Sequence, residues 1–176
     1  MKKPVCQPVL LSAVLAILLN GCTGAKVSEN SKTPPETRNV RTSADVVKLN
    51  YSGVALPAGA AVELPVPISI APGYHVNANP ATFAYLIATE VTADKSEGLT
   101  FGKPIYPTAA KRKFQFAEEP LAVYEGEVQV KLPLQSAANA AKGKRMLSLH
   151  LRIQACDEEK CFPPDTISAT PFVDLK

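Results

Sequence analysis

The strongest constraint on the fold of this chain is an alternation of apolar and other side chains with a period of two. It is clearest over residues 61–70, 128–134 and 147–155. Such alternation indicates β-strands with one buried face. Because proline cannot donate a ladder hydrogen bond, Pro65 and Pro67 predict that the first of these strands lies at a sheet edge.

Weaker strand candidates lie at residues 46–49, 86–92, 99–106, 111–116 and 166–173. Only residues 136–141 have helical propensity, and that segment is too short for more than a turn or two. About seven to nine short strands separated by turn residues predict an all-β chain, an immunoglobulin-like antiparallel β-sandwich. A segment of roughly 130 residues suffices for one such domain with its own core.

The N-terminal residues predict export. Lys2 and Lys3 precede an apolar stretch over residues 9–19 that suits a signal peptide and is too short for a mature membrane-spanning helix. The stretch ends in Leu19-Asn20-Gly21-Cys22, which resembles the lipobox of bacterial lipoproteins, whose cysteine becomes the lipid-bearing N-terminus. An ordinary secretory signal with a chance cysteine is the alternative.

This interpretation divides the chain into a signal peptide over 1–21, an acylated Cys22 with a flexible tether over 22–44, and a folded domain over 45–176. The tether is rich in Ser, Thr, Asn and charged residues and has little to bury. Thr23 stands where lipoproteins retained in the enteric inner membrane have Asp. We therefore expect a cell-envelope lipoprotein that faces the periplasm, with the outer membrane favoured over the inner one in a Gram-negative host.

The mature chain is expected to be nearly neutral, because the leader carries two lysines and no acid while the whole chain has 19 basic and 16 acidic residues. A nearly neutral chain lacks the basic surface that nucleic acid requires. Proteins or small molecules are the expected partners, together with the membrane that holds the lipid anchor.

Of the four cysteines, Cys156 and Cys161 are the pair available for chemistry, since Cys6 lies in the leader and Cys22 is the lipidation site. A disulfide between them closes a small loop, and the chain-entropy relation gives such a bridge a stabilisation of only about 2 kcal/mol. This small gain favours a redox-active pair, although a static disulfide in an oxidising compartment remains open.

The strand pattern also predicts where this pair lies. If residues 147–155 alternate into the core, Cys156 has the opposite parity at the strand end, and Cys161 follows a short charged turn, so both are expected near the surface. His150 alternates outward and is most simply solvated, while His75 follows a Pro-Gly turn and either approaches the site or caps a strand. A metal site combining the sulfurs with these histidines lacks a recognisable spacing, so neither a metal nor a cofactor is predicted.

Three motifs resemble the N-terminal periplasmic domain of the thiol:disulfide interchange protein DsbD, over about residues 46–175. They are Gly73-Tyr74-His75-Val76-Asn77, then Phe116-Ala117-Glu118-Glu119-Pro120-Leu121 leading to Val123-Tyr124-Glu125-Gly126-Glu127-Val128, and Gln154-Ala155-Cys156 through Cys161-Phe162-Pro163-Pro164-Asp165-Thr166. The closing Cys, aromatic, Pro, Pro, acid, Thr run is the most specific part. Four residues separate the cysteines here, about one fewer than in the best-known members.

The resemblance implies an immunoglobulin-like domain that takes electrons from a membrane-embedded donor and passes them to periplasmic thiol-disulfide oxidoreductases. Both partners are expected to be separate proteins. Cys156 and Cys161 are the implied exchange residues, and a shielding loop is implied over 116–123. That loop contributes Phe116, Glu118, Glu119 and Leu121, and the supporting candidates are Tyr74, His75, Tyr124, Phe162 and Pro163.

The charged turn between the cysteines suggests how they divide the reaction. Asp157, Glu158 and Glu159 should raise the thiol pKa values by like-charge repulsion, whereas Lys160 offsets this beside Cys161. We therefore expect Cys161 to join the partner and Cys156 to resolve the mixed disulfide. The alternative function is a non-catalytic, lipid-anchored immunoglobulin-like binding or assembly module with a structural disulfide.

Overall fold

Two ten-residue strands, β3 (Ala61–Ile70) and β9 (Glu127–Ser136), pair antiparallel along their length, from Ala61 opposite Gln135 to Ser69 opposite Glu127. The computed structural model describes residues 42–176, so the predicted leader, Cys22 and nearly all of the tether lie outside the described residues. The alternating apolar residues of both strands face the core, as the period of two predicts, and all but the partly buried Val62 and Val128 are fully buried. They are the centre of the main core: Leu64, Val66, Ile68, Val130, Leu132 and Leu134.

The strands form four small sheets, antiparallel except for one parallel pair, β14 with β2. One sheet has the order β1 (Val47–Leu49), β3, β9, β6 (Leu99–Phe101), and a second the order β13 (Asp165–Ala169), β11 (Leu149–Ile153), β5 (Glu90–Ala93). A third has the order β10 (Gly143–Met146), β14 (Phe172–Leu175), β2 (Val54–Leu56), and the fourth the order β12 (Ala155–Cys156), β4 (His75–Asn77), β8 (Leu121–Tyr124), β7 (Ala110–Arg112).

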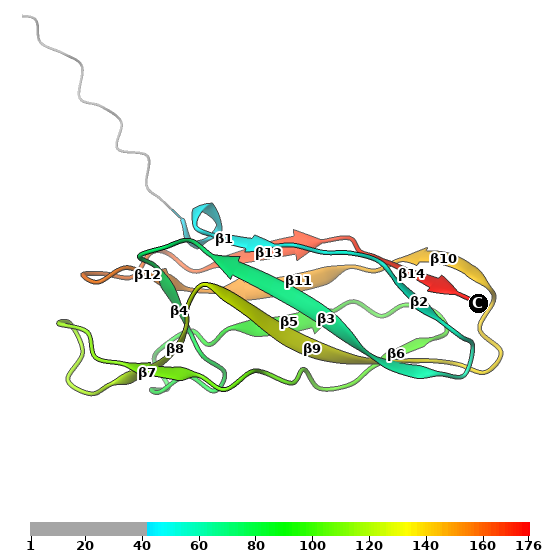
Figure 1. Cartoon of the computed structure of the whole chain (residues 1–176), viewed down its shortest axis with the longest axis horizontal. Coiled ribbons are helices and arrows are strands. Elements are labelled where there is room, and N and C mark those ends of the chain that lie inside the picture. The colour runs from blue at the N-terminus through cyan, green and yellow to red at the C-terminus, as the bar shows by residue number, and fades with distance from the viewer. Residues whose placement is uncertain (1–41) are drawn as a thin grey trace, which may run out of the picture. The chain divides into compact units, whose positions relative to one another are not determined.

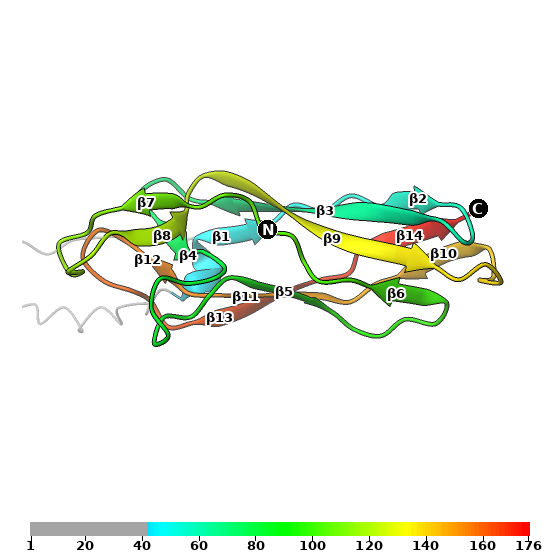
Figure 2. The same cartoon turned by 90° about the horizontal axis from the view of Figure 1, so that it is seen from below.

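These sheets enclose the core as an immunoglobulin-like β-sandwich, which confirms the predicted all-β class. Figure 1 colours and labels the strands by their order in the chain. Figure 2 shows β3 and β9 along one side of the domain and β5, β11 and β13 along the other. Among residues 42–176 the helical element is a short 3-10 turn, η1 (Ser43–Asp45). In this part of the chain no helix has the length and apolar character needed to cross a membrane.

The predicted edge position of β3 is wrong, because β3 lies between β1 and β9. The prolines are tolerated for a local reason: β1 is three residues long and pairs only with Ile68, Ser69 and Ile70. Pro65 and Pro67 therefore precede the part of β3 that β1 covers, and the missing N–H groups interrupt no ladder there.

Other local expectations also differ from the structure. Residues 136–141 form the end of β9 and a turn rather than a helix. Four short strands, β2, β4, β8 and β10, had no clear alternation, since three or four residues are too few to show a period. At the start of the domain Ser43, assigned to the tether, is fully buried in η1.

The predicted strand over 147–155 is present but changes sheets. Residues Leu149–Ile153 form β11 between β13 and β5, and after Gln154 the chain continues as β12 beside β4. Both Ala155 and Cys156 are buried, at 0% and 1% exposure. The change of sheet at Gln154 thus breaks the simple parity that placed Cys156 at the surface.

Candidate functional site

Cys156 and Cys161 form a disulfide with a Cα–Cα distance of 3.9 Å. The two residues face each other as an antiparallel bridge, with Phe162 N donating to Ala155 O on one side and Asp157 N donating to Lys160 O on the other. The surface prediction holds for Cys161, which is exposed, and fails for Cys156, which is 1% exposed. One sulfur-bearing residue is therefore accessible to a partner and the other is enclosed by the domain.

The turn between the cysteines is held by Asp157. Its Oδ1 accepts hydrogen bonds from the backbone N–H groups of Glu159 at 2.9 Å and Lys160 at 2.8 Å. Desolvation raises the pKa of the Asp157 carboxyl, but these two N–H donors, the Lys160 ammonium and His75 outweigh it, so the net pKa is lowered. Asp157 is a turn residue that stays ionised beside the sulfurs.

A buried hydroxyl fastens the segment on either side of the disulfide. Ser43 Oγ donates to Pro163 O at 2.7 Å and accepts from Ala155 N at 2.9 Å. Gln154 Nε2 donates to Phe162 O at 3.3 Å. Ser43 was missed from the sequence because it lies more than a hundred positions from its partners, and no local pattern marks such a contact.

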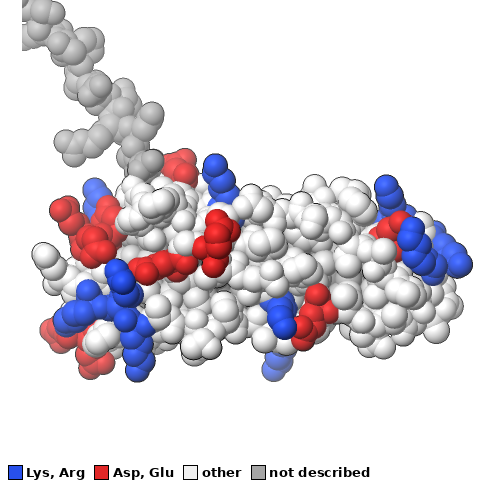
Figure 3. Space-filling model, in the orientation of Figure 1, with Lys and Arg blue, Asp and Glu red and all other residues white. Residues whose placement is uncertain are grey.

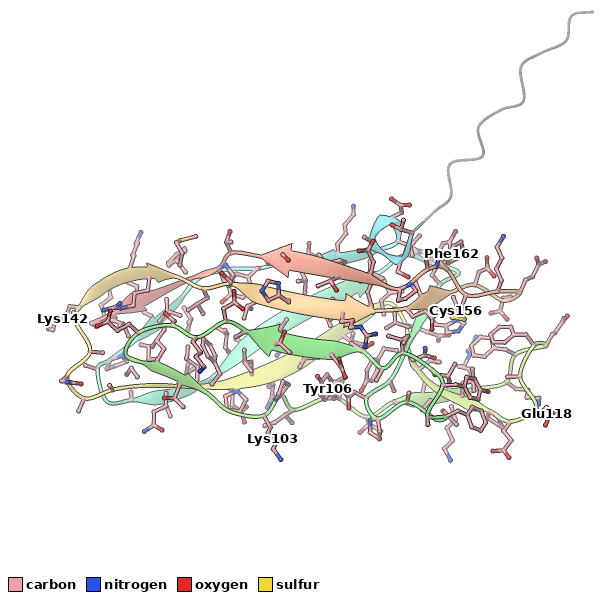
Figure 4. The ribbon with its side chains drawn as sticks, turned by 180° about the vertical axis from the view of Figure 1, so that it is seen from behind. Lys103, Tyr106, Glu118, Lys142, Cys156 and Phe162 are labelled. Atoms are coloured by element: carbon pink, nitrogen blue, oxygen red, sulfur yellow. A yellow bond between two sulfur atoms is a disulfide. The ribbon has the colours of Figure 1, made fainter. Side chains whose placement is uncertain are left out.

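One aromatic pair includes the residue that follows Cys161. The rings of Tyr74 and Phe162 lie 5.7 Å apart and are tilted by 52°. Figure 4 shows Cys156 and Phe162 at the end of the domain that also carries Glu118, while Lys142 marks the opposite end. The supporting candidates Tyr74, Phe162 and Pro163 are thus brought to the disulfide segment.

His75 lies directly opposite Cys156, on the neighbouring strand β4. It is 2% exposed, and its Nε2 has no hydrogen-bond partner among the described residues. Burial, and after it the Arg112 guanidinium, lower the pKa of His75 to about 4, against a smaller raising effect of Asp157. The imidazole is therefore neutral near pH 7.

The implied shielding loop is built differently from the prediction. Phe114, which the sequence analysis did not choose, is 2% exposed and stacks on the His75 ring, with centroids 4.0 Å apart and planes at 17°. Phe116 is 41% exposed and stacks on Phe114 at 5.3 Å. Phe114 and Phe116 alternate with Gln115, and this short alternation was interpreted as part of a strand. The stacking of Phe114 on His75 could therefore not be predicted from the pattern.

Leu121 is the first residue of β8 and belongs to a second, small core cluster with Phe114 and Val123. Its assignment as a loop cover is corrected by this position, because it packs beneath the loop. Glu118 and Glu119 are exposed at the loop tip. Lys113 Nζ closes the loop by donating to Ala117 O at 2.7 Å and to Glu118 O.

Tyr124 has a structural role at the end of the domain that contains the disulfide. It is 2% exposed, and its hydroxyl accepts from Asn79 N at 3.3 Å and donates to Pro107 O at 3.2 Å. Desolvation raises its pKa, with the Asn79 hydrogen bond acting in the opposite direction. These bonds connect β8 to two loops, the role of a core tyrosine.

The second histidine lies elsewhere. His150 on β11 contacts Ser168 Oγ through Nδ1 at 2.9 Å and Asp94 Oδ1 through Nε2 at 3.3 Å, so it is partnered rather than simply solvated. Among residues 42–176 no three His, Cys, Asp or Glu side chains are grouped as metal ligands. On the face drawn in Figure 3, charged side chains gather toward the two ends and few lie between them.

Comparison with known proteins gives one family match. The family model for the N-terminal region of the thiol:disulfide interchange protein DsbD matches residues 47–172. No curated protein matches the chain.

Several solved structures are similar to parts of the chain, including the following three. The reduced N-terminal domain of Neisseria meningitidis DsbD is 24% identical, with 64% of this chain and 78% of that chain covered and a TM-score of 0.43. A chain of a complex between CaDoc0917 and CaCohA2 is 13% identical, with coverage of 74% and 99% and a TM-score of 0.41. A family 123 glycoside hydrolase from Clostridium perfringens is 11% identical, with coverage of 72% and 22% and a TM-score of 0.32.

Proposed function

Because this chain belongs to the family of DsbD N-terminal domains, matched over residues 47–172, we propose that it relays reducing equivalents in the cell envelope through the Cys156–Cys161 pair. The observation that carries the proposal is the unequal exposure of two bonded cysteines, one enclosed and one accessible. Thiol-disulfide exchange requires one sulfur that a partner reaches and a second that stays close enough to resolve the intermediate.

The exchange proceeds in two balanced steps. In the reduced domain the Cys161 thiolate attacks a partner disulfide, which forms a mixed disulfide and releases one partner thiolate. The Cys156 thiolate then attacks Cys161 Sγ, which forms the intramolecular disulfide and releases the second partner thiolate. Two electrons pass to the partner, and the domain is left oxidised.

The loop at residues 113–120 is proposed to cover the Cys156 side of the pair until a partner docks, while Cys161 stays exposed. Phe116 lies at the exposed end of the ring stack that begins at His75, and the hydrogen bonds of Lys113 hold the loop together. Separate thiol-disulfide oxidoreductases of the envelope, a membrane donor and a periplasmic acceptor, are the proposed partners. Acylation at Cys22 is proposed to hold the domain at the membrane, most simply the outer one.

Trapping tests the exchange. Cys156→Ser should accumulate mixed disulfides through Cys161 in the envelope, because no second thiol resolves them, and Cys161→Ser should accumulate far fewer. Equal, negligible trapping in both variants would contradict the relay. Cys22→Ser, the control for the anchor, should abolish acylation and release the protein without changing the reactivity of the pair.

The redox potential separates the relay from a structural bridge. A relay should have a potential in the range of thioredoxin and disulfide isomerases, roughly −270 to −180 mV, whereas a structural disulfide lies below about −300 mV. Equilibration of the purified chain against glutathione or dithiothreitol buffers measures this quantity. A value below that limit would favour an inert binding or assembly module.

A further inference from the structure

We propose that His75 accepts the thiol proton of Cys156 when this cysteine resolves the mixed disulfide. The inference rests on the exchange function proposed above and assigns a role to a residue outside the disulfide itself. Burial creates a problem for this step, because Cys156 must become a thiolate in order to attack and yet is 1% exposed. An enclosed thiol has a raised pKa and poor access to bases in the solvent.

The strand register supplies a base at this position. Cys161 faces Cys156 on one side of β12, and His75 faces it on the other side, on β4. Residues directly opposite each other in antiparallel pairs share a face of the sheet, with Cβ atoms about 4.5–5.5 Å apart. The three side chains therefore form one row, with the resolving sulfur between its target and the imidazole.

His75 has the features of a proton acceptor. Its Nε2 is buried without a hydrogen-bond partner in the described part of the chain, so no donor competes for this nitrogen. Phe114 covers the flat face of the ring, which keeps the edge nitrogens as the reactive positions. The charged groups around the ring are Arg112 from β7, Asp157 and Glu158 from the turn after β12, and Glu125 after β8.

The charged groups near His75 allow the ring to be neutral at rest and protonated for a short time during the reaction. With the disulfide closed, burial and Arg112 keep the ring neutral, which is the form that accepts a proton. When Cys156 is deprotonated, its negative charge and that of Asp157 favour the protonated ring, and attraction between the two new charges is strong in a region of low dielectric. A polar pocket lined by His75, Arg112, Glu125 and Glu158 then offers a route for the proton to solvent.

The proposed step conserves atoms and charge. The proton leaves Cys156 Sγ for the imidazole, the resulting thiolate attacks Cys161 Sγ, and the bond from Cys161 to the partner breaks with its electron pair on the partner sulfur. The imidazolium then returns its proton to solvent or to the leaving thiolate. His75 acts only in this second step, because Cys161 is exposed and is deprotonated by solvent.

A small aromatic disulfide, dithiobis(nitrobenzoate), separates the two steps. Each attack releases one coloured thiolate, the first by Cys161 and the second by Cys156. The experiment uses the reduced full chain with Cys6 and Cys22 replaced by Ser, so that only the pair reacts. His75→Phe keeps a ring against Phe114 without a basic nitrogen, and His75→Gln keeps polarity without an imidazole.

General base catalysis commonly contributes 100-fold or more, and for this weakly basic imidazole we expect the second release to slow roughly 10- to 100-fold in both variants. The rate of the first release should change less than about twofold. The second release should need a higher pH to reach the same rate as in the wild type. A second release at the wild-type rate in either folded variant overturns the inference. Equal slowing of both releases also overturns it, because that result reports a structural role. A wild-type chain that gives no second release would instead contradict the exchange function.

Discussion

The body of the molecule, built on β3 and β9, and the site end, built on β12, β4, β8 and β7, reach stability by different means. The body pairs two strands of ten residues over a single large core cluster. At the site end the strands have two to four residues, and Phe114, Leu121 and Val123 form their own small cluster. Side-chain hydrogen bonds, such as those of Ser43, also hold the segment on either side of the disulfide.

We therefore expect the stability of the domain and the reactivity of its cysteine pair to respond to different substitutions. The main core cluster, to which the long strands β3 and β9 contribute, contains most of the buried apolar side chains, so it should determine most of the free energy of unfolding. The small cluster and the loop above it should determine access to the sulfurs. Four experiments test this separation, in order of decreasing effect on stability.

The largest effect is expected in the body. Leu132→Ala removes a 1% exposed side chain from the centre of β9 and should lower the free energy of unfolding by about 3–5 kcal/mol. Leu121→Ala is the matched change at the site end, where a smaller cluster can relax, and should cost about 2–3 kcal/mol. Urea unfolding measures both.

The same pair of variants also tests reactivity. An alkylating reagent should modify the reduced thiols of folded Leu132→Ala at the wild-type rate. It should modify those of Leu121→Ala faster, because this substitution removes a side chain that packs against Phe114. Faster alkylation in both variants would show that the two regions are one cooperative unit.

The second effect concerns pH. The pKa of His75 is about 4 in the folded domain and 6.5 in the unfolded chain, so the unfolded chain binds the additional proton between these values. Stability should therefore fall as pH decreases from about 6.5 to about 4, by up to about 3 kcal/mol from this group. His75→Gln should flatten the decrease across this window. An unchanged slope would show that the ring is not held neutral by burial.

The third effect is that of reduction. Opening the Cys156–Cys161 bridge frees a loop of six residues and should lower the free energy of unfolding by about 2 kcal/mol or less. Denaturant unfolding with and without dithiothreitol measures it in the chain with Cys6 and Cys22 replaced by Ser. A loss comparable to that of Leu132→Ala would mean that the bridge supports the body, contrary to the proposed separation.

The smallest effect on stability is expected for the exposed ring of the loop. Phe116→Ala removes a 41% exposed side chain and its stacking on Phe114, which is worth about 0.5–1.5 kcal/mol. Alkylation of the reduced pair should become severalfold faster, since the cover is lost. Phe172→Ala, a 37% exposed ring in β14, is the matched control and should leave the alkylation rate unchanged. Equal rates in the two variants would contradict the shielding role.

Local patterns explain what the sequence could predict. The alternation in 61–70, 128–134 and 147–155 identified the three main strands and with them the all-β class, since a period of two depends only on neighbouring residues. The closing motif around Cys156 and Cys161 identified the family because its residues are contiguous. The predicted leader and lipid anchor lie outside the described residues and stay predictions.

Tertiary structure decided the environment of the pair. The shift from β11 to β12 enclosed Cys156, and only the pairing of β12 with β4 placed His75 opposite it. Ser43 and Phe114 reach the site from distant parts of the chain. Sequence periodicity records which face of a strand is apolar, but it does not record which strand lies beside it. The two cysteines that form the disulfide could therefore be identified from the sequence, while their burial, their neighbours and the unequal exposure of the two residues were fixed by long-range strand pairing.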